Sequence, residues 1–286
     1  MSVPRPAAGL LADNSAGALR DQLDEVWSSL ADLGATIRDD EWNLATPCPG
    51  WDVAAQYAHM IGTESSLLGR PTPDAVAETL PHVRNQIGAM NEAWVASLAS
   101  SGRHEVLERF REVTAARREA LRAMSEEDFS RPSWTPVGEA DYRRFMQIRV
   151  FDCWVHEQDI RDALSRPGHV TGPAVEQSLD EIVRAAGYVV GKLSQAPSGS
   201  TVRLVLTGPA LRTVNVSVAD GRARVVDELE TPPTATIRLS SDAYARLSCG
   251  RLPPSAVLED GALGGVDFSG EAALGRRVVE HLAFTI

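Results

Sequence analysis

The sequence has few cysteines, few aromatic residues and almost no lysine. Its three cysteines, Cys48, Cys153 and Cys249, lie far apart without C-x-x-C spacing, which argues against a disulfide framework or a cysteine zinc knuckle. We therefore expect reduced thiols. Lys192 is the only lysine, and no block of Lys and Arg occurs. Because phosphate-binding surfaces carry a basic excess, this pattern and the formal net charge of -11 argue against a nucleic-acid partner.

Long apolar runs are also lacking. No apolar stretch is long enough to span a membrane, and Met1–Gly17 has no basic segment leading into an apolar one, so we expect a cytoplasmic protein without a membrane partner. The G-x-S-x-G, Walker and G-x-G-x-x-G motifs do not follow any predicted strand, so serine hydrolases, P-loop NTPases and dinucleotide enzymes have no support. With 286 residues, 43% of them hydrophobic, the chain can form one large or two ordinary domains.

Helical periodicity dominates the first two thirds of the chain. Apolar residues recur at helical spacing, and glycine or proline interrupts the pattern between segments. The predicted helices cover residues 15–34, 51–68, 81–99, 106–124, 141–164 and 174–193. Residues 194–200 then change to linker composition, which predicts a domain boundary.

Beyond that boundary the pattern alternates with a period of two, which predicts antiparallel strands. These strands cover residues 202–206, 214–218, 223–225 and 235–239, and helices are predicted over 241–249 and 271–282. We expect two domains: a helical bundle over residues 1–195, and a small α+β domain over 201–286 whose helices pack on one face of its sheet.

The helix over residues 141–164 carries ionisable groups within its apolar stripe. Asp152 and His156 are four residues apart, so on a helix they share one face and can hold one cation. A catalytic metal needs a third protein ligand, and His59 on the helix that begins at Trp51 is the best candidate. The residues therefore suggest a divalent metal held by His59, Asp152 and His156.

Other interpretations of these residues stay open. Asp152 and His156 can form a hydrogen bond inside the bundle without a metal. Asp159 lies on the same face and is an alternative carboxylate ligand, or a group that orients a ligand histidine or pairs with an arginine. Cys48 lies in a proline-flanked loop just before the His59 helix and is a candidate reactive thiol. The tryptophans have a simpler interpretation as core residues.

Two segments resemble the mycothiol-dependent maleylpyruvate isomerase family of actinobacteria, which belongs to the DinB-like metalloenzyme superfamily. They are TPCPGWDVAAQYAH (46–59) and RVFDCWVHEQDIR (149–161). The resemblance implies a DinB-like four-helix bundle that holds a divalent metal, usually zinc, through His59, Asp152 and His156. It also implies a small sterol-carrier-like C-terminal domain. The isomerase itself has glutamate where this chain has Asp152, one methylene shorter, which shifts the metal or changes how the carboxylate binds it.

The resemblance also implies a function. Mycothiol would serve as thiol cosubstrate, and its metal-activated thiolate would attack a small electrophile, either as a cis-trans isomerase or as a thiol transferase. Arg149 and Arg251 are candidates for binding the anionic groups of the cofactor or substrate. We expect a monomer or a weak homodimer. Two alternatives are a non-catalytic protein that binds a small ligand, with a structural metal or none, and a metal-dependent hydrolase.

Overall fold

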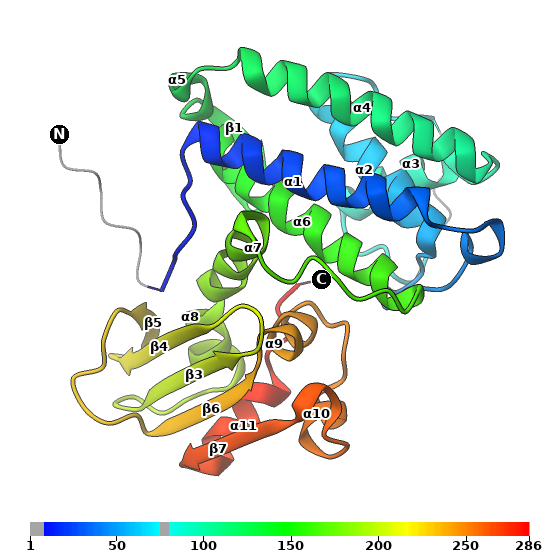
Figure 1. Ribbon diagram of the computed structural model, residues 1–286. Helices are drawn as coiled ribbons and strands as arrows, with labels where there is room; N and C mark the ends of the chain where they lie inside the picture. Colours follow the sequence, from blue (N-terminus) through cyan, green and yellow to red (C-terminus); the bar gives the residue numbers. More distant parts are fainter. Residues whose placement is uncertain (1–8, 75–79, 286) are drawn as a thin grey trace. The chain divides into compact units, whose positions relative to one another are not determined.

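The computed structural model describes residues 9–74 and 80–285. Helices come first and a sheet follows, so the predicted order of a helical N-terminal region and a sheet region is confirmed (Figure 1). The helices are α1 (Ala16–Ala35), α2 (Val53–Leu67), α3 (Gln86–Leu98), α4 (Arg103–Ala123), α5 (Glu126–Phe129), α6 (Tyr142–Ala163), α7 (Pro173–Arg184), α8 (Ala186–Tyr188), α9 (Ser241–Ser248), α10 (Pro254–Leu258) and α11 (Ala272–Glu280). The strands are β1 (Pro132–Thr135), β2 (Gly138–Asp141), β3 (Thr201–Thr207), β4 (Arg212–Ala219), β5 (Arg222–Val226), β6 (Ala235–Ser240) and β7 (Val266–Gly270). Short helical turns cover η1 (Asp39–Glu41), η2 (Val189–Leu193) and η3 (Ala262–Gly264).

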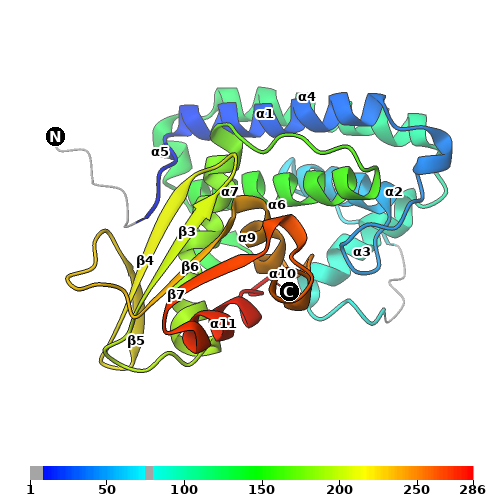
Figure 2. The same ribbon diagram turned by 60° about the horizontal axis from the view of Figure 1, so that its bottom comes forward.

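The helical unit comprises residues 13–169. Helix α1 packs against α4 and α6, and α2 packs against the same two helices, so these long helices surround a common core. Both ribbon views show α1 and α4 running side by side (Figures 1 and 2). Helix α3 packs against α2. The apolar stripe predicted on α1 is buried throughout; it consists of Leu19, Leu23, Val26, Trp27, Leu30 and Leu33.

A small hairpin precedes α6, between two predicted helices, in a stretch for which the sequence predicted neither helix nor strand. Strands β1 and β2 pair antiparallel, with Pro132 opposite Asp141 and Thr135 opposite Gly138. The Thr135 hydroxyl donates to the Gly138 carbonyl at 2.6 Å and closes the turn. Each strand has four residues, which is too short for a clear period-two signal. The hairpin contacts α6, and the Asp141 carboxylate at its end accepts from the Arg144 amide and caps that helix.

The sheet unit comprises the described residues 9–12 and 170–285. Its strands have the order β5-β4-β3-β6-β7 in the described part of the chain. Inward side chains lie in register, with Leu204 opposite both Val214 and Ile237, while residues that alternate with them are less buried. This confirms the predicted alternation between a buried and a more exposed face. The prediction that all strands are antiparallel is wrong, because β3 and β6 pair parallel. Strand β7 was also not predicted.

The two units divide earlier in the chain than the sequence predicted. We expected a boundary after residue 195, whereas the compact units separate between His169 and Val170. Helix α8 and the turn η2 belong to the sheet unit because they pack directly on β5. A Cβ atom at Gly187 would lie 2.8 Å from the Ala223 carbonyl oxygen, so this contact requires glycine. The linker-like residues 194–200 are therefore a connection within the sheet unit.

The described helices include none whose length and apolar character would suit it to cross a membrane. Helices α1 and α4 bury mainly apolar residues on one face and expose charged residues on the other, as helices of a folded bundle do.

Candidate metal centre

A structured loop positions His59. The Thr46 hydroxyl donates to the Trp51 carbonyl oxygen at 2.7 Å and accepts from the Cys48 amide at 3.2 Å. Gly50 completes the turn with a φ of 84°, a value that favours glycine. The Asp52 carboxylate then accepts from the Ala55 amide at 2.8 Å and caps α2. His59 lies on the second turn of this helix, with its side chain buried.

Helix α6 supplies the other two predicted ligands. Asp152 and His156 share one face, and Asp152 Oδ1 lies 3.4 Å from His156 Nε2. The other oxygen, Asp152 Oδ2, lies 3.0 Å from His59 Nε2. Ligand atoms of all three side chains lie within 4.8 Å of one another. The structure therefore brings together His59, Asp152 and His156, which come from helices about ninety residues apart.

The donor set suits a divalent cation. Two imidazoles and one carboxylate are ligands that zinc accepts, and catalytic zinc sites use three protein ligands with an open position. The Nδ1 atom of His59 is buried and has no hydrogen-bond partner. The Asp152 side chain remains 29% exposed while both histidines are buried, so the group is open to solvent on the carboxylate side. The same contacts also satisfy Asp152 without a metal, which is the alternative that the sequence left open.

A chain of buried charges holds Asp152 in place. Arg149 donates to Asp152 Oδ2 and, at 2.9–3.0 Å, to Glu64 Oε1. Glu64 in turn accepts from Arg117 at 2.9 Å, and Arg117 donates to the Tyr142 hydroxyl at 2.9 Å. Glu64 is fully buried and Arg149 is 3% exposed. Because each buried charge has a partner of opposite sign, the network fixes the carboxylate that lies between the two histidines.

The protonation states of Asp152 and His59 favour cation binding, whereas that of His156 opposes it. Burial opposes ionisation of Asp152, but the Arg149 guanidinium, with the two imidazoles, holds its pKa well below the ordinary value. Burial lowers the pKa of His59 and favours the neutral ring. Burial acts in the same direction on His156, but Asp152 and then Asp159 raise its pKa, so a bound cation would have to displace a proton there. Burial raises the pKa of Cys153 to about 12, which excludes it as a thiolate nucleophile.

Trp51 covers the two histidines. Its ring centroid lies 4.9 Å from that of His59 and 5.5 Å from that of His156. The indole Nε1 donates to Glu92 Oε1 on α3 at 2.6 Å, and His82 Nε2 lies 2.6 Å from the same oxygen. Trp51 is therefore more than the core residue that the sequence suggested, because it packs against both candidate ligands and is held there by a buried carboxylate.

The two predicted cofactor-binding arginines lie in different units. The Arg149 guanidinium contacts Glu64, Asp152 and Cys153 inside the bundle, so its visible task is to hold Asp152. Arg251 belongs to the sheet unit, where its Nη1 donates to the Cys249 carbonyl at 3.0 Å. Cofactor binding by either residue stays a prediction.

Two buried charged residues that support the candidate ligands were not predicted from the sequence. Glu64 and Arg117 were not singled out, although both are buried and support Arg149. A signal was available for Arg117: it lies four residues after Val113 and four before Leu121, so on the helix predicted over residues 106–124 it shares one face with these two apolar residues. A charge at such a position indicates a buried partner. Asp159, predicted to orient a histidine, has its Oδ2 3.4 Å from His156 Nδ1.

Comparisons with known proteins find a family model that matches most of the helical unit, and solved structures that share the fold. Residues 23–161 match the family model described as the mycothiol maleylpyruvate isomerase N-terminal domain. Two uncharacterized proteins from strains of Mycobacterium tuberculosis, MT0041 and Rv0036c, are each 27% identical over 221 residues, covering 74% of this chain and 80% of theirs. The crystal structure of the mycothiol-dependent maleylpyruvate isomerase matches with a TM-score of 0.55 and 18% identity, over 89% of this chain and 92% of that one. At this identity the structural likeness concerns the fold.

Proposed function

We propose, from the match of residues 23–161 to the family model of mycothiol maleylpyruvate isomerase N-terminal domains, that the protein is a member of this family and a metal-dependent, mycothiol-dependent enzyme. It acts on a small electrophile as an isomerase or as an S-transferase. The observation that carries the proposal is the convergence of His59, Asp152 and His156 within 4.8 Å. We take the helical unit to be a DinB-like bundle, the sheet unit to be sterol-carrier-like and the cytoplasm to be the place of action.

The residues of the chain have separate tasks in this proposal. His59, Asp152 and His156 hold the divalent cation, with zinc the best fit to two imidazoles and a carboxylate. When bound, such a cation stabilises the thiolate of a thiol that enters its open position, so that a nucleophile exists at neutral pH. Arg149 keeps Asp152 ionised and oriented, and Trp51 shields both imidazoles from solvent on one side.

Metal analysis tests the proposal first. We expect purified wild type to contain one divalent ion per chain, and both His59→Ala and His156→Ala to lose it, because each removes one of three ligands. The control is His104→Ala, since His104 is exposed on α4 and should leave the metal content unchanged. If His59→Ala and His156→Ala retain the wild-type metal content, the proposed site does not exist.

A thiol-consumption assay tests the reaction. The metal-loaded enzyme is given mycothiol and a panel of small electrophiles that includes maleylpyruvate. Consumption of mycothiol indicates a transferase, whereas isomerised product with mycothiol conserved indicates an isomerase. Turnover that persists without any thiol would instead support the metal-dependent hydrolase. Binding without turnover across the panel would support a ligand-binding protein.

A further inference from the structure

His156 has two ring nitrogens, and each faces a different carboxylate. Nε2 lies 3.4 Å from Asp152 Oδ1, on the side that the proposed function uses. Nδ1 lies 3.4 Å from Asp159 Oδ2, within ion-pair distance but without hydrogen-bond geometry. This Nδ1 atom is buried and has no hydrogen-bond partner. A buried polar atom without a hydrogen-bond partner lowers the stability of the fold unless another group binds it, so Nδ1 is a candidate ligand atom.

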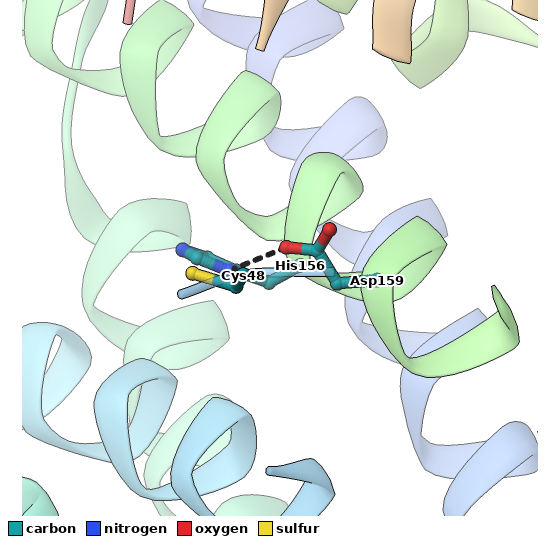
Figure 3. A group of neighbouring side chains, drawn as sticks. All are labelled: Cys48, His156 and Asp159. Atoms are coloured by element: carbon teal, nitrogen blue, oxygen red, sulfur yellow. Dashed lines mark ion pairs between the residues drawn. The ribbon is translucent and has the colours of Figure 1, made fainter. Parts of the chain in front are cut away.

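Cys48 completes a group on this second side. Its Sγ, a nitrogen of His156 and an oxygen of Asp159 lie within 4.8 Å of one another. Figure 3 shows the Cys48 sulfur beside the imidazole, with the Asp159 carboxylate next to the same ring. Asp159 is 1% exposed and His156 is 6% exposed, whereas Cys48 is half-buried. Cys48 and Trp51 also line a cavity of about 400 Å³, which gives a small ligand access to the sulfur.

We propose that Cys48, His156 and Asp159 form a second divalent-metal site, selective for zinc, that shares His156 with the first site. Thiolate, imidazole and carboxylate are all zinc ligands, and the thiolate favours zinc over the hard cations magnesium and calcium. The loop Thr46–Trp51 supplies one ligand and α6 supplies two that are three residues apart, so the group needs no rearrangement of secondary structure. Cys48, which has no role in the proposed reaction, is a metal ligand in this second site.

Sharing one imidazole has a consequence for function. The sharing rests on the proposed function, whereas the three ligands on the second side do not. An imidazole that binds two cations has to give up both of its ring protons, so the second ion binds more weakly than the first. Two divalent cations on one ring also repel each other, so the second ion weakens the binding of the first. Excess zinc is therefore expected to inhibit the enzyme through Cys48.

Zinc titration of the full-length protein, freed of metal by a chelator, tests the site. Wild type is expected to bind a tight and a weaker equivalent. Cys48→Ser loses only the weaker one, with its affinity lowered more than about 100-fold, because the loss of an outer-shell partner alone already costs about 10–100-fold. His59→Ala loses only the tight one, His156→Ala loses both, and the control His104→Ala keeps both. With Co²⁺ in place of zinc, a sulfur-to-cobalt charge-transfer absorption is expected in wild type and in His59→Ala, and not in Cys48→Ser.

The outcomes separate the two proposals. If Cys48→Ser binds zinc like wild type and shows the same cobalt spectrum, the second site is wrong while the first stands. If the only equivalent bound by wild type is lost in Cys48→Ser and kept in His59→Ala, the second site is right and the metal centre of the proposed function is wrong. Should His59→Ala fail to fold, Asp152→Asn replaces it, with tryptophan fluorescence as the check of folding.

Discussion

Replacing Arg149 with methionine should strongly destabilise the helical unit. The substitution keeps a long, unbranched side chain in a site where only 3% of the arginine side chain is exposed. It removes the cation that Glu64 and Asp152 share, and Glu64 is fully buried. Removing one partner of a buried ion pair costs about 3–5 kcal/mol, and because Arg117 still compensates part of the Glu64 charge we expect a loss near the lower end of this range. A loss of that size is a large share of the about 5–15 kcal/mol by which folded proteins are stable.

Tryptophan fluorescence during urea unfolding measures this loss of stability in the helical unit, to which Arg149 belongs. All six tryptophans lie within residues 13–169, so the signal reports on the helical unit alone; they are Trp27, Trp42, Trp51, Trp94, Trp134 and Trp154. The protein should be free of metal, so that a bound ion does not add its own stabilisation. The control is Arg109→Met, because the Arg109–Glu105 pair is about half exposed on both sides. It should cost less than about 0.5 kcal/mol.

A double mutant sharpens the test. If Glu64 and Arg149 act as one pair, the combination of Glu64→Gln with Arg149→Met should destabilise by less than the sum of the two single changes. Additive losses would mean that the two side chains contribute independently. An Arg149→Met variant whose free energy of unfolding falls no further than that of the Arg109→Met control would refute the reasoning altogether.

Two further predictions concern a buried histidine and a close helix contact. Burial opposes protonation of His169, but the Glu157 carboxylate, 2.6 Å from Nδ1, raises its pKa. The interaction of the protonated ring with Glu157 therefore stabilises the fold fully below about pH 6.5, and this contribution is lost as pH rises through the folded-state pKa. The stability difference between wild type and His169→Asn, which tolerates the positive φ there, should therefore be larger at pH 6 than at pH 9; a difference independent of pH would contradict this. Gly62→Ala should destabilise by about 1–3 kcal/mol, because the added Cβ would lie 2.3 Å from a Trp94 ring atom. Gly17→Ala, with nothing within 4 Å, should be neutral or stabilise by up to about 1 kcal/mol in the same unfolding assay, and equal effects of the two changes would rule out steric contact as the cause.

The sequence was sufficient for features that depend on local order along the chain. Helical spacing predicted the long helices and the buried stripe of α1, because the buried face of an amphipathic helix has an apolar residue at every third or fourth position. It also placed Asp152 and His156 on one face of α6. The residue types suggested His59 as the partner of that face, the resemblance implied the same set, and the structure brings the three together.

Tertiary structure alone decided what surrounds those residues. The contacts of Arg149 with Glu64, and of Trp51 with Glu92, join residues that are 85 and 41 positions apart in the sequence, so no local pattern encodes them. The same holds for the parallel pairing of β3 with β6, since alternation shows which face of a strand is buried but not the direction of its neighbour. Cys48 is the clearest case. The sequence shows a thiol in a loop, whereas only the fold sets its sulfur beside the imidazole of His156, about a hundred residues further along the chain.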